Sequence, residues 1–283
     1  MVPPPQQADR TPAATAPASV VAAVLAGARS REDTVAAAEG VATKVFADIA
    51  GVPMLQRVLE VMLAVTGRTS VYLSGPEHSL LEATSWLAAR VERGEVAWQP
   101  PQDSPALSAA AVVERAFAAE PAPAAVLLTT GDHPLLSVST AERFVVDALA
   151  AGTDVAVGLA RHAEVQAAFP GSRRTALKLA DGPFCGCNLF LIRTDRGRAV
   201  LDLWRQLETD RKRPLRMAAT LGSGMMLRYL TGRLTSASVV GRLEALTGAS
   251  VAVVPVTDPD AAVDVDSLAD LATVRARWQV RSA

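Results

Sequence analysis

VVAAVLAGARS occupies residues 20–30 of the chain. Its first six residues, Val20–Leu25, are apolar and rich in β-branched side chains, so they predict a buried β-strand. The small residues at positions 26–28 predict a turn whose backbone N–H groups can approach a phosphate closely. Arg29 in this turn and Lys44 further along can neutralise a triphosphate. The alternative is an ordinary strand end followed by two solvated charges.

The rest of the chain as far as residue 160 alternates short apolar runs with segments of helical periodicity. The predicted strands are residues 69–74, 95–98, 124–130 and 154–159, and the predicted helices are residues 53–66, 77–93, 105–119 and 139–151. Residues 26–52 are expected to be mostly loop. This alternation predicts an α/β fold, in which a mostly parallel, Rossmann-like sheet is flanked by helices. Ligands are expected at the carboxyl ends of its strands.

The pattern changes after residue 160. Two strands, residues 175–179 and 188–192, surround a turn at residues 181–183, and three helical segments follow at 195–209, 216–230 and 235–246. A strand at 250–255 and a helix at 267–277 complete the chain. We therefore expect a disordered tail at 1–18 and one domain at 19–283. A helical insertion at 196–248 would precede the last strand and shape an acceptor pocket or an oligomer contact. The alternative is that its apolar faces simply pack on one another and on the sheet.

The composition narrows the function. Half of the 283 residues are hydrophobic, the formal net charge is −1, and the pI is near 6.3, which gives no support for nucleic-acid binding. The sequence has no apolar run long enough for a transmembrane segment. The two cysteines, Cys185 and Cys187, are too few for a disulfide framework, and a cytoplasmic location is expected.

Two acidic segments are candidates for a metal site. Asp132 follows the predicted strand at 124–130, and a carboxylate at the carboxyl end of a strand is suited to Mg²⁺. Asp264 and Asp266 are two positions apart, so in an extended chain they face the same side. Capping roles are the alternative: Asp132 can close a turn, and Ser267 with Asp270 can cap the final helix.

These segments, in this order, resemble those of the MobA-like NTP transferases, which include molybdenum-cofactor guanylyl- and cytidylyltransferases. The matching segments are Leu25–Ser30, Lys44 with Ile49–Leu55, Gly131–Leu136 and Asp264–Leu271, together with Ser108 and Asn188. Ala28 departs from the pattern because it replaces the second glycine of the first loop. The resemblance implies a GT-A-like fold and a nucleotidyltransferase that transfers an NMP moiety from an NTP to a phosphorylated small molecule and releases pyrophosphate.

The resemblance also implies roles for particular residues. The expected catalytic residues are Arg29, Lys44 and Asp132, and the residues expected to bind the nucleotide are Leu25, Ala26, Gly27, Ala28, Arg29, Lys44 and Ser108. The acceptor is expected to contact Arg173, Arg174, Lys178 and Asn188. Mg²⁺ or Mn²⁺ is expected to bind to Asp132, Asp264 and Asp266. GTP or CTP is the favoured donor, and a homodimer is compatible with the sequence. No general base is expected, because the acceptor phosphate is already ionised. His133 is therefore interpreted as a neighbour of the site.

Two other functions fit the same pattern. A GT-A glycosyltransferase would use a nucleotide-sugar and an Asp-x-Asp metal site, although Arg29 and Lys44 supply more charge than a nucleotide diphosphate-sugar requires. A catalytically silent, nucleotide-binding regulatory domain is the second alternative, since Ala28 restricts how closely the loop backbone can approach a phosphate.

Overall fold

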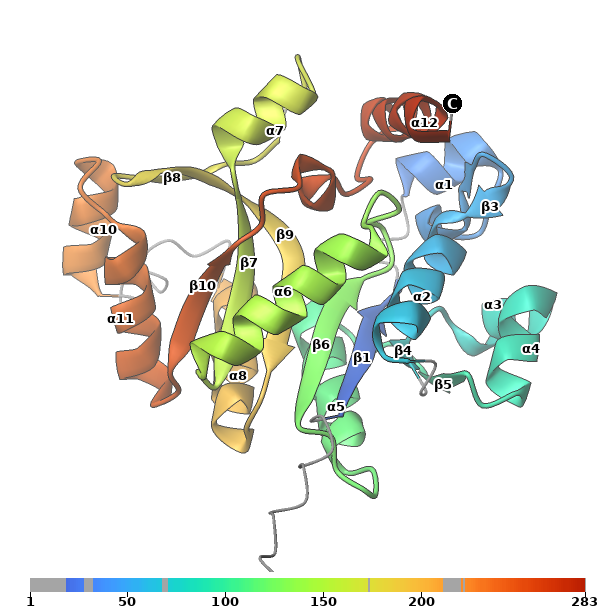
Figure 1. Cartoon of the computed structure of the whole chain (residues 1–283), viewed down its shortest axis with the longest axis horizontal. Helices are drawn as coiled ribbons and strands as arrows, with labels where there is room; N and C mark the ends of the chain where they lie inside the picture. Colours follow the sequence, from blue (N-terminus) through green and yellow to red (C-terminus); the bar gives the residue numbers. More distant parts are fainter. Residues whose placement is uncertain are drawn as a thin grey trace, which may run out of the picture.

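The fold is built on one large mixed sheet, seen in a computed structural model that describes residues 19–27, 33–67, 71–172, 174–210, 220 and 222–282. Seven strands follow the order β10-β7-β9-β6-β1-β4-β5, and β8 pairs with β9 beside them (Figure 1). Their bounds are β1 Val20–Leu25, β4 Val71–Ser74, β5 Val96–Gln99, β6 Ala125–Thr130, β7 Val155–Arg161, β8 Leu177–Leu179, β9 Gly182–Ile192 and β10 Val251–Pro255. A separate short ribbon pairs β2 (Asp48–Ile49) with β3 (Val52–Pro53).

Strand directions confirm the mostly parallel sheet. β1 runs parallel to both β6 and β4, whereas β9 is antiparallel to all three of its partners, β6, β7 and β8. Along the chain, β1 is followed by β4 and β5 on one side and then by β6 on its other side, so the carboxyl ends of β1 and β6 form a switch point of the kind where α/β proteins bind ligands. The predicted turn at 181–183 is the start of β9, which is longer than the predicted strand at 188–192.

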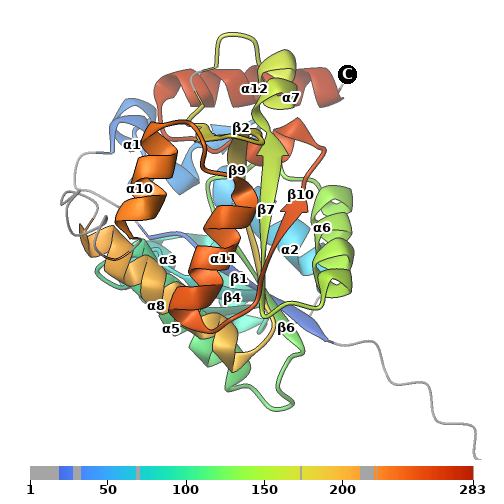
Figure 2. The same cartoon turned by 90° about the vertical axis from the view of Figure 1, so that its left-hand side faces the viewer.

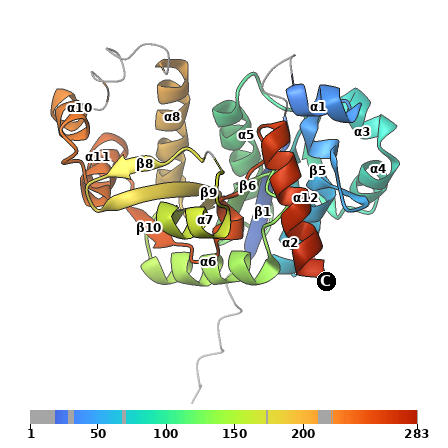
Figure 3. The same cartoon turned by 90° about the horizontal axis from the view of Figure 1, so that it is seen from above.

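Helices cover both faces of the sheet (Figures 2 and 3). One face carries α2 (Met54–Val65) and α6 (Val138–Ala151), and the other carries α5 (Pro105–Phe117) and α8 (Asp195–Asp210). The alternation of side chains along β1 explains this arrangement: its Ala22 and Val24 belong to the first core, whereas Ala23 and Leu25 belong to the second.

Two local predictions were wrong, and one helix was missed. Residues 77–93 form two helices, α3 (His78–Ala83) and α4 (Ser85–Glu92), because the backbone of Thr84 leaves the helical region between them. The segment 26–52 contains α1 (Thr34–Glu39) and the 3₁₀ turn η1 (Lys44–Phe46), so it is more ordered than a loop. A short helix after β7, α7 (His162–Ala168), was not predicted.

The helical region before the last strand is joined to the main body. α8 packs on α5, and α11 (Ser236–Thr247) packs on both α8 and β10. Between them, α10 (Ser223–Leu230) is shorter than the predicted helix at 216–230, of which residues 216–219 and 221 lie outside the described part. At least α8 and α11 therefore belong to the helical layer on that face.

The final segment crosses the rim of the sheet. After β10, the chain forms the 3₁₀ turn η2 (Pro259–Ala262) and then α12 (Leu268–Ser282), which lies above the carboxyl ends of the central strands in Figure 1. This path brings residues 263–267 next to the loop that follows β6. Among the described residues, no helix combines the length and apolar character needed to span a bilayer.

Candidate active site

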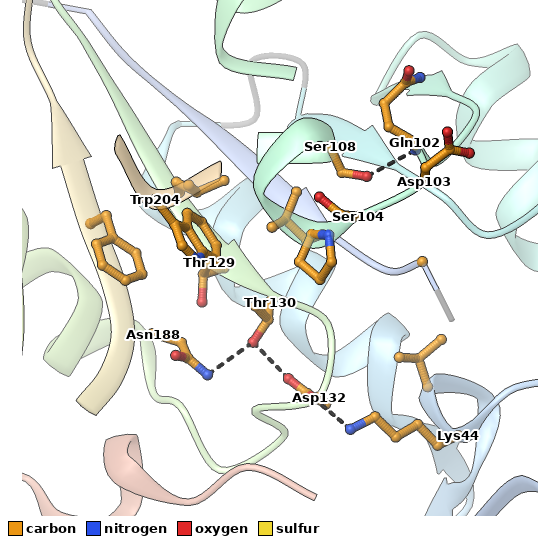
Figure 4. A pocket seen from close by; sticks show the side chains of 16 residues that line it. Lys44, Gln102, Asp103, Ser104, Ser108, Thr129, Thr130, Asp132, Asn188 and Trp204 are labelled. Atoms are coloured by element: carbon orange, nitrogen blue, oxygen red, sulfur yellow. Dashed lines mark hydrogen bonds and ion pairs between the residues drawn. The ribbon is translucent and has the colours of Figure 1, made fainter. Parts of the chain in front are cut away.

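A cavity of about 130 Å³ lies at the carboxyl ends of β1 and β6 (Figure 4). Its lining combines a polar floor, a short loop before α5, and an aromatic wall. The lining residues are Leu25, Gly27, Lys44, Val45, Gln102, Asp103, Ser104, Pro105, Ser108, Leu128, Thr129, Thr130, Asp132, Asn188, Phe190 and Trp204. The switch point of the sheet is therefore a pocket in which chemically active side chains gather.

The turn after β1 is held closely by its neighbours. The Ala26 N–H donates to the Ser74 carbonyl, so this amide continues the sheet and does not face a ligand. A Cβ atom on Gly27 would lie 2.9 Å from the Cβ atom of Pro101, and one on Gly75 would lie 2.7 Å from the Gly27 nitrogen. A side chain therefore does not fit at either position, so both residues must be glycine. Of the predicted nucleotide-binding residues here, Leu25 and Gly27 line the pocket, Ala26 is buried, and residues 28 and 29 lie outside the described part.

Asp132 is fixed by the strand that precedes it. The Gly131 N–H donates to the Leu25 carbonyl at 2.8 Å, which anchors the loop after β6 to β1. The Thr130 hydroxyl then donates to Oδ1 of Asp132 at 2.6 Å. Only 7% of Asp132 is exposed. Its second oxygen, Oδ2, remains directed at Lys44.

Lys44 connects three segments that are far apart in the sequence. Its ammonium lies 2.8 Å from Oδ2 of Asp132, 2.5 Å from Oδ1 of Asp266 and 2.7 Å from the Val265 carbonyl. Its backbone N–H donates to Asp33, whose other carboxylate oxygen caps α1. Asp33 therefore sets the position of Lys44. Sequence reasoning missed this residue, although an Asp before a helical segment is a recognisable N-cap.

The two predicted acidic side chains near the end of the chain have different environments. The Val265 N–H donates to the Asp132 carbonyl at 3.1 Å and places this segment beside the loop after β6. Asp266 contacts Lys44 and is 55% exposed at its side chain. Asp264 instead forms an ion pair with Arg174, which also binds Asp270 at 3.0 Å. The structure thus brings the acidic segments together but gives Asp264 and Asp266 different partners.

Arg174 differs from the expectation that it is a free cation for an acceptor. Only 7% of its side chain is exposed. Its guanidinium donates to the Asp264 carbonyl and carboxylate, to Asp270 and to Ser172. The donors of this side chain are therefore used inside the protein. Lys178, another predicted acceptor residue, is exposed on β8 and does not line the pocket, and Arg173 lies outside the described residues.

Ion pairing determines the charge of the central groups. Burial alone would raise the pKa of Asp132, but the positive charges of Lys44 and His133, together with the hydrogen bonds from Lys44 and Thr130, outweigh it and hold that pKa at about 2. Burial lowers the pKa of Lys44, and Asp132 and Asp266 more than compensate, so it is raised overall. The pKa of Asp264 is raised by burial and by the nearby carboxylates Asp132 and Asp266, against the opposing effects of His133 and Arg174. Asp132 and Lys44 are thus both charged at neutral pH.

Asn188 reaches the site from an irregular part of β9. The pairing of β7 with β9 shifts register between Val157 and Leu159, and Asn188 has a left-handed backbone with φ of 47°. Bulges of this kind re-aim side chains, and Asn tolerates the left-handed region better than most residues. The Asn188 amide then lies 2.7 Å from Nε2 of His133 and 3.4 Å from the Thr130 hydroxyl.

His133 and Ser108 mainly support the pocket. Nδ1 of His133 lies 3.2 Å from the Ala261 carbonyl, and its Nε2 lies 2.7 Å from the amide nitrogen of Asn188, so both ring nitrogens have a partner inside the protein. The hydroxyl of Ser108 accepts a hydrogen bond from the Gln102 N–H at 2.9 Å and shapes the loop before α5. Ser108 lines the pocket and is 5% exposed, and its expected contact with the nucleotide stays a prediction.

The donor set suits a divalent cation. Two carboxylate oxygens, from Asp132 and Asp266, converge on the position where the Lys44 ammonium now supplies a positive charge. Within the described residues, no cluster of three or more His, Cys, Asp or Glu side chains is placed to hold a metal. Mg²⁺ accepts such a sparse site, since it commonly takes one or two carboxylates together with water and substrate phosphate oxygens.

Comparison with known proteins shows which proteins this chain resembles. The family model described as "MobA-like NTP transferase domain" matches residues 22–250. A hypothetical transferase from Thermus thermophilus shares 29% sequence identity and a TM-score of 0.70, over 89% of this chain and 99% of that one. No protein among those with curated descriptions matches the chain. Asp264 and Asp266 lie beyond the matched range, so their place in the site rests on the geometry above.

More distant solved structures share the fold. A CMP:2-keto-3-deoxy-manno-octonic acid synthetase complexed with CTP has 17% identity and a TM-score of 0.56, over 93% of this chain and 99% of that chain. A 4-diphosphocytidyl-2C-methyl-D-erythritol synthase from Anaerococcus prevotii has 11% identity and a TM-score of 0.52, over 92% and 97% of the respective chains. The predicted α/β architecture is therefore confirmed.

Proposed function

Because the chain belongs to the MobA-like NTP transferase family, we propose that it transfers an NMP moiety from an NTP to a phosphorylated small molecule and releases pyrophosphate. Nucleotidyl transfer itself follows from the family. The phosphorylated acceptor, the preference for GTP or CTP and the requirement for Mg²⁺ or Mn²⁺ are our proposals. The family match favours this reaction over a glycosyltransferase and over a catalytically silent domain.

One observation supports the proposal most strongly. Lys44, Asp132 and Asp266 come from three distant parts of the sequence, yet their charged atoms meet within 2.8 Å at one end of the pocket. Asp132 is buried, so this cluster is not an exposed surface ion pair of the kind that contributes little to stability. The arrangement instead suits a binding site in which the Lys44 ammonium neutralises the carboxylates until a charged ligand binds.

We propose that Asp132 and Asp266 hold Mg²⁺, with Asp264 as a neighbouring carboxylate. When bound, the metal would neutralise phosphate charge as it builds up during transfer. A triphosphate would offer Lys44 new anionic partners in place of the two carboxylates, and Arg29 is a second candidate for these phosphates. The low pKa of Asp132, about 2, keeps its carboxylate ionised for this purpose.

The chemistry requires little from the protein beyond positioning and charge. An acceptor phosphate oxygen would attack the α-phosphorus of the NTP, a new P–O bond would form, and the bond to pyrophosphate would break. A phosphate monoester is mostly dianionic at neutral pH, so the attack needs no general base. The hydrogen bonds of His133 to Ala261 and Asn188 agree with a supporting role for this ring.

Calorimetry with each of the four NTPs, with and without Mg²⁺, tests the proposal. We expect one NTP, GTP or CTP, to bind only when Mg²⁺ is present. A panel of phosphorylated acceptors should then yield phosphate only when inorganic pyrophosphatase is added, because pyrophosphate is the product. If no NTP binds in the presence of Mg²⁺, the proposed function is wrong.

A further inference from the structure

Two segments that are distant in the sequence meet at the pocket, where Lys44 joins them. The first segment, residues 33–49, contains α1, η1 and β2, and the second, residues 263–282, contains α12 and the acidic residues before it. The Lys44 ammonium contacts the Asp266 carboxylate and the Val265 carbonyl. The proposed reaction weakens this contact, because Lys44 would turn to the triphosphate and Asp266 to Mg²⁺. The two segments then need a second connection to stay together.

Arg275 supplies such a connection outside the pocket. It belongs to α12, which packs against α1 and β2 (Figures 1 and 3). Its guanidinium forms a forked ion pair with the Glu39 carboxylate, with Nη1 at 3.0 Å from Oε1 and Nη2 bound to Oε2. It also donates to the Asp48 carbonyl, from Nε at 3.0 Å and from Nη2 at 2.8 Å. Since Glu39 precedes Lys44 and Asp48 follows it, Arg275 holds the chain on both sides of Lys44.

Hydrogen bonds link each end of this ion pair to the charged groups at the pocket. Glu39 is the last residue of α1, and Asp33, which caps the start of that helix, accepts the Lys44 backbone N–H at 3.0 Å. On the other side, Asp270 in the first turn of α12 accepts the Asp266 N–H at 3.2 Å. A forked contact between a guanidinium and a carboxylate fixes geometry better than a single hydrogen bond does. The position of α12 against α1 therefore helps to set the separation of Lys44 and Asp266.

We propose that Arg275 is a positioning residue, which keeps Lys44 and Asp266 at the separation that the NTP and Mg²⁺ require. It acts through Glu39 and Asp48, and neither Arg275 nor Glu39 lines the pocket. This inference rests on the proposed function. In the ligand-free protein, Lys44 and Asp266 also join the two segments directly, so the loss of Arg275 has little effect on stability. In the loaded protein, the connection through Arg275 remains when that direct contact is lost.

Calorimetry with the NTP that wild type binds, at saturating Mg²⁺ and without acceptor, tests the proposal. Arg275→Met keeps much of the side-chain length and removes the guanidinium. We expect the Kd for the NTP to rise about fivefold, the upper end of the range for a partly exposed ion pair. Glu39→Gln, at the other end of the pair, should raise Kd as well. Arg275→Lys should be intermediate, since an ammonium keeps the charge but not the forked contact.

Arg198→Met is the matched control. Arg198 pairs with Glu114 at 3.0 Å and so joins α8 to α5. Its side chain is 38% exposed, against 37% for Arg275, and it does not line the pocket. Urea unfolding without ligand should give similar midpoints for Arg198→Met and Arg275→Met. The Kd for the NTP should rise only in Arg275→Met, because only this arginine connects the segments that carry Lys44 and Asp266.

Three results would overturn the proposal. The first is an unchanged Kd for the NTP in Arg275→Met. The second is a rise of equal size in Arg198→Met, which would show that the loss of any such ion pair loosens the site. The third is a urea midpoint far lower in Arg275→Met than in Arg198→Met, which would make Arg275 a residue of the fold itself. Failure of wild type to bind any NTP with Mg²⁺ is a separate observation and would instead contradict the proposed function.

Discussion

Among single residues, Asp132 has the clearest expected role. Asp132→Asn keeps the size of the side chain but removes the charge that pairs with Lys44. We expect kcat/KM to fall by roughly 100-fold or more, the scale of losing one electrostatic contact to the reacting phosphates. Asp147→Asn on the surface of α6 is the matched control. Wild-type turnover by a folded Asp132→Asn variant would remove this carboxylate from the site.

The ion pair also predicts how stability depends on pH. The folded-state pKa of Asp132 is about 2, below its usual 3.8, so its stabilising contribution is present above the usual value and is lost as pH falls towards 2. We expect urea unfolding to show that wild type loses more stability than Asp132→Asn between pH 5 and pH 2. Parallel stability curves would mean that the Lys44 pair does not stabilise the folded state.

Asp264 and Asp266 should differ when each is changed to Asn. Asp266 meets Lys44 at the pocket and is largely exposed, so its loss should raise the Mg²⁺ concentration needed for half-maximal activity with little change in stability. Asp264 pairs with buried Arg174, so its loss should lower stability. Activity across a Mg²⁺ titration, together with thermal unfolding, separates the two. Wild-type behaviour of both variants would exclude this segment from the site.

The sequence predicted these residues better than it predicted their partners. Asp132 could be found because it directly follows an apolar run, and a strand end is a local signal. The partnership of Arg174 with Asp264 joins residues 90 positions apart, and that of Lys44 with Asp266 joins residues 222 apart. Such pairings depend on the path of the chain through the whole fold, so spacing in the sequence gives no information about them.

At the scale of elements, Arg174 links the segment after α7 to the start of α12. Arg174→Met keeps much of the side-chain length but leaves Asp264 and Asp270 without their cation. Breaking a buried ion pair in this way costs about 3 kcal/mol of unfolding free energy. Urea unfolding should show this loss. The Mg²⁺ concentration needed for activity should also rise, because Asp264, which Arg174 holds in place, is only two residues from Asp266. Lys178→Met, on the exposed surface of β8, is the control.

A small effect of Arg174→Met on both unfolding and the Mg²⁺ requirement would contradict this interpretation. If acceptor KM alone rose, the original expectation of an acceptor-binding arginine would be restored. Arg174→Lys should be intermediate, since an ammonium can keep one ion pair but cannot reproduce the forked contacts to two carboxylates.

Local sequence patterns predicted whether a segment is a helix or a strand more reliably than they predicted bulges and breaks within it. β1 and β6 were predicted within one residue because their apolar runs end at small or polar residues. The bulge that turns Asn188 towards His133 depends on how β7 pairs with β9, and β9 is eleven residues long. Pairing between distant strands is a tertiary property. The single helix expected at 77–93 is interrupted at Thr84 for a reason that helical periodicity does not encode.

At the scale of the whole molecule, the site joins the two ends of the described chain. Lys44 follows α1, Asp132 follows the central strand β6, and Asp266 precedes the last helix, α12. A ligand that binds all three therefore stabilises contacts between the N-terminal half of the fold and its C-terminal segment. Ligand binding at this site is expected to raise the stability of the whole fold, because only the folded chain brings the three side chains together.

A thermal-shift experiment tests this coupling. At an NTP concentration about 100 times its Kd, with Mg²⁺ present, the folded state gains about 2.7 kcal/mol. For a domain of this size, that corresponds to a rise in Tm of roughly 5 °C. Either EDTA or the Asp132→Asn substitution should abolish the rise, whereas Asp147→Asn should retain it. A rise of equal size in EDTA would show that NTP binds without the metal, and would place the nucleotide away from Asp132 and Asp266.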